Sequence, residues 1–410
     1  MKKKMFSIAV VLLAVGCIGS VWAFNAQEKQ KPQEIRGISV DEHDVAWYET
    51  QQRLWQQQAA LSSDDEHAWQ QAFEAARYVD MLTGSYGLTA RKQAILEQMA
   101  LHISNSFVYN LCMYMTEVEQ YDGEPVRYAE QALRLMPENM CRKDMEILLS
   151  YLWRAGKSMT DRNSEDYRQF HGLVQRLYAT NAYPSYLLRY THNSLQGMEE
   201  NAIYFVNGDV PAYTSLVLQE ALGVHTDKVI VPVSFLYIEA FRKALCQRLE
   251  ISDMETEKDY ASAESGVDGY LQDVLEHIIH NSKRPTYFFP DGSFPDTPSF
   301  KKNLYNEGLV FRYSTHPYDN VAVAKRNVEE RYAFQYLMEP KFVCEEQWKG
   351  SERIQLNYMV MLAPIVKSYK EDGDTLHANQ LTRYLCAAVV NTSIPQEEKQ
   401  KYIHLLSTAK

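Results

Sequence analysis

Apolar residues recur every three or four positions through most of this chain, a spacing that is typical of amphipathic helices. The pattern predicts helices in succession from about residue 41 to residue 200 and again from 316 to 410. In the first stretch, small residues such as Ala68, Ala72 and Ala76 share one helix face and suit closely packed helix pairs. The expected pairs are 93–118 with 125–136, 144–155 with 163–180, and 357–371 with 375–390, and a final helix is expected over 394–406. Helix pairs in succession indicate a short solenoid.

The period changes between residues 201 and 315, where short apolar runs rich in aromatic and β-branched residues predict strands. The expected strands are 202–206, 229–235, 286–289 and 309–313, with helices expected over 213–222, 238–249 and 270–279. A strand, helix, strand, helix order predicts a parallel βαβ unit. Pro232 falls inside the second run, so we expect an edge strand or an irregularity there. The predicted fold class is therefore mixed and mostly α, with helical hairpins flanking a small α/β domain.

The N-terminal residues have the pattern of a cleavable export signal. Lys2, Lys3 and Lys4 precede an apolar run of about 11 residues, which is too short to span a bilayer. Small or medium residues at Val21 and Ala23 predict cleavage after Ala23. Residues 1–23 are therefore predicted to be a signal peptide, and the polar, aperiodic residues 24–40 a flexible lead-in. The helical region 41–200, the α/β region 201–315 and the helical region 316–410 would follow.

Cys17 leaves a second N-terminal interpretation open. It follows Leu13-Ala14-Val15-Gly16, which loosely resembles a lipoprotein box with Ala14 in the place of the usual larger aliphatic residue. Lipidation of Cys17 would tether the protein to a membrane without changing its fold. The protein is expected to be exported in either case, in the periplasm or associated with the outer membrane.

Charge and composition narrow the classes of binding partner that the chain is expected to have. The chain has a net charge of −11, so the phosphate backbone of a nucleic acid would repel it. No block of lysine and arginine offsets this charge, and nucleic acid is therefore not an expected partner. After the signal, no apolar run is long enough for a transmembrane helix. The remaining cysteines lie far apart without CxxC spacing, and most have apolar neighbours, which favours buried free thiols. They are Cys112, Cys141, Cys246, Cys344 and Cys386.

Parts of the helical regions resemble tetratricopeptide repeats. Tyr369, Gly373 and Ala378 have the spacing of that repeat's aromatic residue, turn glycine and packing alanine. Ala132 and Pro137 have the spacing of its late alanine and closing proline. Generic helix hairpins remain the alternative interpretation, because other consensus positions are missed.

The middle of the chain resembles a segment found in Bacteroidota proteins. The segment occurs in the soluble C-terminal part of mannosyltransferase-like membrane proteins and in exported repeat proteins. The likeness covers roughly residues 165–390 and rests on 201–209 (Asn-Ala-Ile-Tyr-Phe-Val-Asn-Gly-Asp), 218–220, 223–227, 229–231, 284–288 and 308–312. Family members usually continue with Asn-Asp-Thr, where this chain has Val210, Pro211 and Ala212. The resemblance implies a fold and a compartment and carries over no activity.

Asn207, Gly208 and Asp209 form the main candidate ligand site. They follow the first strand and precede a helix, and ligands gather at the carboxyl ends of strands in open α/β sheets. A helix N-terminus also offers free backbone N–H groups. We include Gln219 and Glu220, from the same segment, as further candidate ligand-binding residues. The structural alternative is that Asn207 and Asp209 satisfy local backbone donors, and the absence of Asn-Asp-Thr favours it.

Other polar groups give weaker indications. His277 and His280 lie three apart beside Glu276, but the third ligand and the spacing of a zinc site are missing, so no metal is expected. Asp291 and Asp296 could pair for acid–base catalysis, although their proline-rich setting is typical of turns. Neither a nucleophile-elbow motif nor a phosphate-binding glycine loop is present, and no cofactor is predicted. A Cys/His nucleophile pair stays open.

Two functions remain. The first is a non-enzymatic interaction protein of the cell envelope that binds a protein partner through its repeat-like helices. The 28 tyrosines and 6 tryptophans of the chain would supply aromatic anchors for contacts with that partner. The alternative is a glycan- or small-ligand-binding protein, or an enzyme, that uses the Asn207-Gly208-Asp209 loop.

Overall fold

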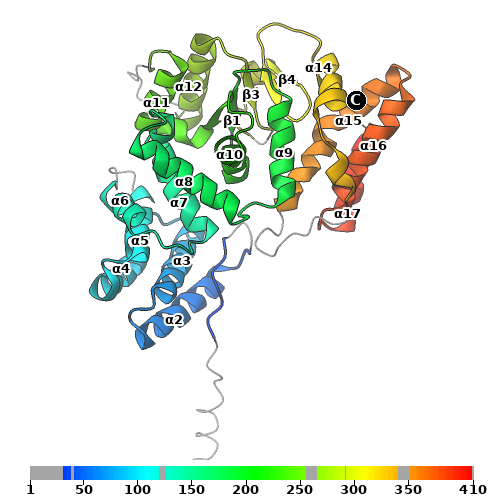
Figure 1. Cartoon of the computed structure of the whole chain (residues 1–410). Helices are drawn as coiled ribbons and strands as arrows, with labels where there is room; N and C mark the ends of the chain where they lie inside the picture. Colours follow the sequence, from blue (N-terminus) through cyan, green and yellow to red (C-terminus); the bar gives the residue numbers. More distant parts are fainter. Residues whose placement is uncertain are drawn as a thin grey trace, which may run out of the picture. The chain divides into compact units, whose positions relative to one another are not determined.

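This computed structural model describes residues 31–37, 41–119, 126–254, 266–290, 292–339 and 351–408 (Figure 1). The predicted signal peptide with Cys17 lies outside these residues, as do Asp291 and Cys344. The described residues form two compact units, one up to Pro137 and the other from Glu138 onward. They are mostly helical and carry one small five-stranded sheet, which confirms the mixed, mostly α class at that level.

The first unit is helical throughout its described elements. Its helices are α2 (Val45–Leu61), α3 (Glu66–Leu82), α4 (Ala90–Ile103), α5 (Phe107–Glu119) and α6 (Val126–Arg134). The side chains of Asp44, Asp65 and Thr89 each accept a backbone N–H three residues further on and so cap the first three of these helices. The single helix predicted over 93–118 is wrong, because the chain breaks at Ser104–Ser106. Ser106 Oγ accepts the N–H of Tyr109 at 3.0 Å and starts α5 afresh.

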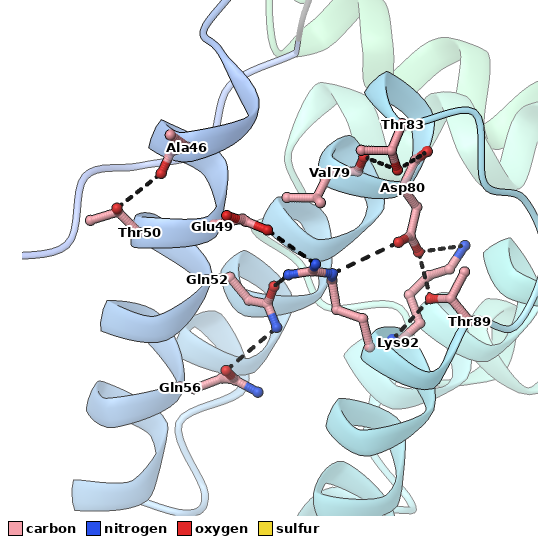
Figure 2. A network of polar contacts seen from close by, with 11 residues as sticks. Ala46, Glu49, Thr50, Gln52, Gln56, Val79, Asp80, Thr83, Thr89 and Lys92 are labelled. Atoms are coloured by element: carbon pink, nitrogen blue, oxygen red, sulfur yellow. Dashed lines mark hydrogen bonds and ion pairs between the residues drawn. The ribbon is translucent and has the colours of Figure 1, made fainter.

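Helices α2 and α3 lie side by side (Figure 1), and α3 carries several completely buried alanines. Ala68, Ala72, Ala75 and Ala76 are completely buried, as the small-residue pattern predicted. Figure 2 shows polar contacts of the same unit, where Asp80 lies between Thr89 and Lys92. Thr89 Oγ1 donates to Asp80 Oδ2 at 2.6 Å, and the Lys92 ammonium lies 3.6 Å from the same oxygen.

Residues 31–37 of the predicted lead-in are bound to α2 and α3 in the structure. The Gln33 N–H donates to Gln51 Oε1 at 2.7 Å, and the Gln33 carbonyl accepts from Trp55 Nε1 at 2.8 Å. The Ile35 N–H donates to Gln71 Oε1 at 2.5 Å, and the Ile35 side chain is buried. Side chains of two helices thus hold the backbone of this extended segment.

The sheet of the second unit mixes parallel and antiparallel strands. Its strands are β1 (Ile203–Val206), β2 (Val229–Pro232), β3 (Thr286–Phe288), β4 (Leu304–Asn306) and β5 (Phe311–Tyr313), in the order β2-β1-β3-β5-β4. Strand β1 pairs in parallel with β2 and β3, whereas β5 pairs antiparallel with β3 and β4. Strand β1 is buried at every position, as expected of a central strand covered on both faces.

The sequence located four of these strands and missed β4, a three-residue strand whose positions are all half-buried. The second predicted strand is wrong beyond Pro232. There the chain enters the 3₁₀ turn η3 (Val233–Tyr237), because proline cannot donate to a ladder. The edge position expected from Pro232 is confirmed, since β2 is an outer strand.

Helices precede, separate and follow the strands along the chain, and they surround the sheet in the structure (Figure 1). Before β1 lie α7 (Arg142–Arg154), the turn η1 (Lys157–Met159), α8 (Glu165–Ala179) and α9 (Ser185–Gln196). Between β1 and β3 lie α10 (Asp209–Leu216) with its π-helical continuation η2 (Val217–Ala221), α11 (Glu239–Leu249) and α12 (Gly266–Ser282). After β3 come α13 (Pro298–Lys301), α14 (Asn320–Arg326) with the π-helical η4 (Asn327–Arg331), and the turns η5 (Gln335–Met338) and η7 (Ser351–Gln355).

The chain ends in helices α15 (Leu356–Glu371), α16 (Thr375–Val390) and α17 (Gln396–Thr408). Helices α15 and α16 pack together around the predicted turn, in which Gly373 adopts a φ of 75°. The Asp374 side chain accepts the N–H of His377 at 3.1 Å and caps α16. Among the helices of the described ranges, none is both long and apolar enough to cross a membrane.

Candidate functional site

The structure separates the five predicted ligand-binding residues into two groups. Asn207, Gly208 and Asp209 lie at the carboxyl end of β1, where α10 begins. Gln219 and Glu220 lie in η2, at the other end of the same helical segment. Eleven residues at about 1.5 Å of rise each place Asp209 and Glu220 roughly 16 Å apart along the helix. The two groups therefore cannot hold one small ligand together.

We call residues 207–209 the strand-end loop, which occupies one edge of the parallel part of the sheet. The register pairs Val206 with Pro232 and Phe205 with Phe288, so the carboxyl ends of β1, β2 and β3 lie at this edge. The predicted position at the end of a strand and the start of a helix is present in the structure. It is the place where open α/β sheets offer room for ligands.

Gly208 makes the sharp turn from strand to helix. Its φ of 82° lies in the region that disfavours other residues, and a Cβ there would have no atom within 4 Å. The backbone conformation at this position, and not a lack of space for a side chain, therefore requires glycine. As the N-cap of α10, Gly208 offers no side-chain acceptor to the N–H groups of the first turn. These donors are left for solvent or a ligand.

The side chains of Asn207 and Asp209 do not cap the helix. Both residues are exposed, and neither side chain forms a hydrogen bond or ion pair with any residue the structure describes. The structural interpretation favoured by the sequence is therefore wrong at these positions, because Gly208 takes the N-cap and Asp209 is already the first helical residue. Two polar side chains therefore adjoin a helix N-terminus there, and neither has a side-chain partner within the described ranges.

A half-buried ion pair lies close to this loop. Arg142 Nη1 contacts both carboxylate oxygens of Glu146, at 2.8 and 2.9 Å, and the Tyr183 hydroxyl donates to Glu146 Oε1. The Tyr213 hydroxyl, one turn into α10, donates to the Glu146 carbonyl at 3.1 Å. Helix α7 is thereby attached to α10 next to Asp209.

Both members of this ion pair interact electrostatically with Asp209. Burial raises the pKa of Glu146 against the lowering effect of Arg142, and the Asp209 charge raises it further. Desolvation by the surrounding protein also raises the pKa of the Asp209 carboxyl, although the residue is exposed, and Arg142 opposes this rise. Asp209 is thus a carboxylate in a partly desolvated setting, where hydrogen bonds to a ligand are stronger than in water.

Gln219 has a structural role. Its Nε2 donates to the carbonyls of His225 and Lys228, at 2.7 and 3.0 Å, and so fixes the turn that leads into β2. His225, with a φ of 57°, in turn contacts His192 of α9, with 2.9 Å between His225 Nε2 and His192 Nδ1. These two bonds engage the amide N–H donors of Gln219, so the side chain has a structural role in this turn.

Glu220 belongs to a separate polar cluster. Its Oε2 accepts the Tyr167 hydroxyl at 2.5 Å and lies 3.2 Å from His171 Nδ1, both on α8. Desolvation and, second to it, the hydrogen bond to Glu220 raise the pKa of Tyr167 to about 12. Glu220 therefore joins η2 to α8 rather than serving the strand-end loop.

The other candidate groups are engaged locally. His277 Nε2 donates to the Ser252 carbonyl at 2.8 Å, and His280 Nδ1 donates to the Glu276 carbonyl at 2.7 Å. Asp296 pairs with Lys301, while Asp291 lies outside the described residues. Within the described ranges, no three His, Cys, Asp or Glu side chains are grouped in a way that could hold a metal ion.

The described cysteines are free thiols. Cys112 and Cys246 are buried as predicted, whereas Cys141 is exposed at the start of α7. Desolvation raises the pKa of Cys246 to about 11, and desolvation and Asp144 raise that of Cys141 to about 12. A thiol with so high a pKa is protonated at neutral pH and is a poor nucleophile.

Sequence reasoning missed Arg142, Glu146 and Tyr183. They come from α7 and from the chain between α8 and α9, more than 20 residues before the strand-end loop. No local spacing links them to the loop. The i, i+4 spacing of Arg142 and Glu146 was the available signal, since it predicts an ion pair on one helix face.

Comparison of the chain with protein-family models, with curated proteins and with solved structures finds no match.

Proposed function

We propose that the protein is an exported binding protein whose strand-end loop holds a small polyhydroxylated ligand, such as a sugar unit of an envelope glycan. The observation that supports it best is the exposed loop whose polar groups have no partner among the described residues. The Asn207 amide both donates and accepts, Asp209 accepts, and the first turn of α10 donates. Sugar hydroxyls both donate and accept, so they can satisfy all three groups.

The compartment in this proposal rests on the sequence. The Lys2–Lys4 cluster, the apolar run and the Val21–Ala23 site have the order of an export signal. The resemblance to exported Bacteroidota proteins supports the same location. We also propose that β1, α10 and β2 form a βαβ unit. We propose in addition that α15 and α16 pair as the helices of a tetratricopeptide repeat do.

Ligand binding is tested on the chain from residue 24 with a panel of envelope sugars, by thermal shift and then by calorimetry. For a sugar that binds, Asn207→Ala should weaken affinity about tenfold or more, because it deletes a hydrogen bond in a partly desolvated place. Asp209→Asn should do the same, because a neutral amide accepts a weaker hydrogen bond than a carboxylate. The matched control is Asn105→Ala, an exposed turn residue of the first unit, which should leave affinity unchanged.

Two results would contradict the proposal. One is that no sugar shifts the melting temperature of the unsubstituted chain. The other is a sugar that binds equally well to Asp209→Asn and to the unsubstituted chain, which would place it elsewhere on the protein.

A protein partner in the envelope is the second candidate function. The first unit exposes large apolar side chains, with Leu61, Leu101 and Tyr86 each more than 70 % exposed. Such side chains favour contacts with another protein. A photo-crosslinker in place of Leu101 or Tyr86 should yield one discrete adduct in native envelopes, and the same group in place of exposed Gln93 should not. Equal adducts at all three positions would contradict a specific partner.

A further inference from the structure

Two helices of the first unit bind the segment at residues 31–37 by its backbone. On α2, Gln51 Oε1 accepts the Gln33 N–H at 2.7 Å, and Trp55 Nε1 donates to the Gln33 carbonyl at 2.8 Å. On α3, Gln71 Oε1 accepts the Ile35 N–H at 2.5 Å. We call the surface that carries these three side chains the α2–α3 face. Hydrogen bonds to the main chain give affinity that does not depend on the bound sequence.

Only one side chain of the bound segment is buried. Ile35 is 6 % exposed, whereas Lys31, Gln33 and Glu34 are exposed and the remaining residues of the segment are half-buried. The three hydrogen bonds and the buried aliphatic side chain do not require any particular residue at the exposed positions. A segment of another polypeptide with an aliphatic residue in the place of Ile35 can therefore make the same contacts.

The α2–α3 face is held together by the packing of its two helices. The Trp55 ring lies edge-to-face against the His67 ring of α3, with 5.3 Å between the ring centres. Ala68 and Ala72 of α3 are completely buried. Groups that are already positioned lose less conformational entropy when they bind. The face is thus suited to receive a chain from outside.

The 31–37 segment leaves one buried group of this face unsatisfied. Gln51 is 1 % exposed, and its Oε1 accepts the Gln33 N–H, but its Nε2 has no hydrogen-bond partner within the described ranges. A buried donor without an acceptor is unfavourable. Since both atoms belong to one amide that lies against the segment, a bound backbone that also offered a carbonyl to Nε2 would fit this face better.

We propose that the α2–α3 face is a binding site for an extended segment of another protein, and that residues 31–37 occupy this site in the free chain. The partner's segment carries Ile, Val or Leu in the place of Ile35 and offers a backbone carbonyl to Gln51 Nε2. The 31–37 segment of a second copy is not the favoured occupant, because its identical sequence would leave the same donor unpaired.

The resident segment competes with the partner. Residues 38–44 connect it to α2, and a competitor on so short a tether acts at an effective concentration on the order of millimolar. The free chain is therefore autoinhibited, and release of the segment exposes the site. This site lies in the first unit and the strand-end loop in the second, so the proposal goes beyond the proposed function, and a failure of sugar binding would not affect it.

The test is binding of a fluorescein-labelled synthetic peptide with the sequence of residues 30–38 to the chain from residue 24, measured by fluorescence polarisation. In the unsubstituted chain the resident segment should keep binding weak. Ile35→Asp in the chain should release that segment, because a carboxylate replaces a buried aliphatic side chain, and should tighten peptide binding about tenfold or more. Ile35→Pro, which deletes the N–H donated to Gln71, should act in the same direction.

Variants in the two helices identify the site on the Ile35→Asp chain. Gln71→Ala should weaken peptide binding about tenfold or more, because it removes an acceptor of the bound backbone. Gln57→Ala, at an exposed glutamine of α2, is the matched control and should leave the affinity unchanged. A peptide with Asp in the place of Ile35 should not bind.

Peptides selected from a random library on the Ile35→Asp chain report the chemistry of the partner. They should share an aliphatic residue at one position and should bind more tightly than the peptide of residues 30–38, because they can also satisfy Gln51 Nε2. Gln51→Glu keeps an acceptor at this position and deletes that donor. It should therefore reduce the advantage of the selected peptides.

Three outcomes would overturn the proposal. The first is that neither Ile35→Asp nor Ile35→Pro binds the peptide of residues 30–38 or a selected peptide, although both variants keep the helical circular dichroism of the unsubstituted chain. The second is an equal loss of binding in Gln57→Ala and Gln71→Ala. The third is a dimer of the unsubstituted chain that Gln71→Ala dissolves, which would assign the face to a second copy.

Discussion

Lys92 and Asp80 form a buried ion pair in the first unit. The Lys92 side chain is completely buried, and its ammonium lies 3.6 Å from Oδ2 of Asp80 (Figure 2). Thr89 donates to the same oxygen, and Arg91 Nε lies 3.8 Å from Oδ1. Asp80 thus connects the end of α3 to the start of α4, and it compensates a charge that would be costly if unpaired.

Replacing Asp80 by alanine should destabilise the first unit by about 3–5 kcal/mol, because the Lys92 ammonium would remain buried without its carboxylate. The measurement is hydrogen exchange of the α3 and α4 amides. In the control, Asp80→Ala combined with Lys92→Met should recover most of the loss. A double variant no more stable than the single one would show that lost packing, not the unpaired charge, is the cause.

The backbone of the strand-end loop gives a second prediction. Gly208→Ala should cost about 1 kcal/mol of unfolding free energy, since a residue with a Cβ is disfavoured at this positive φ. Gly172→Ala is the matched control, because Gly172 lies inside α8 with open space around it. That control should gain about 0.5–1 kcal/mol. Urea unfolding measures both, and two changes of the same sign would contradict the argument.

The His192–His225 contact should make the second unit less stable in acid. Desolvation lowers the pKa of both residues, and His192 and Lys228 lower that of His225 further, to about 4. The unfolded chain, with an ordinary pKa near 6.5, then binds more protons than the native chain between those values. Stability from this pair is complete above about pH 6.5 and falls as the pH drops toward about 4.

After discounting for partial exposure, the loss should amount to about 1–2 kcal/mol. Urea midpoints between pH 7 and pH 4.5 measure it. His225→Gln should flatten the slope, whereas His102→Gln, on the exposed end of α4, should not. An unchanged slope in His225→Gln would remove the pair as the cause.

The segment at residues 31–37 should loosen when the side-chain oxygens that accept its backbone N–H groups are removed. Gln71→Ala deletes the acceptor of the Ile35 N–H and should raise the rate at which protease cleaves near this segment several-fold, because cleavage needs a locally detached chain. Gln57→Ala, at an exposed glutamine of α2, is the control and should be cleaved at the original rate. Equal rates in both variants would mean that the burial of Ile35 alone holds the segment.

Periodicity located the helices at the end of the chain almost to the residue. The pair 357–371 with 375–390 was predicted, and α15 and α16 span Leu356–Glu371 and Thr375–Val390. Local signals sufficed there because Gly373 and Asp374 form the turn and the cap themselves. Strand β4 was missed because its three half-buried positions leave no periodic pattern.

The candidate site was predictable only in part. Asn207, Gly208 and Asp209 could be placed at a strand end, because β1 is a continuous apolar run followed by a turn signal. Whether their side chains cap a helix could not be predicted, since that depends on which residue takes the N-cap. Gln219 and Glu220 were grouped with them by sequence proximity, and the helix between them separates the two sets.

The sequence by itself determined where apolar faces alternate with polar ones, and hence the succession of helices and the short strands. It did so because helix and strand periods are local properties of neighbouring residues. Only the tertiary structure decided which polar groups from separate segments meet, such as Arg142 and Glu146 beside Asp209, and Glu220 with Tyr167 and His171. Electrostatic partners are set by distance in space, and residues from separate segments approach one another only after the chain has folded.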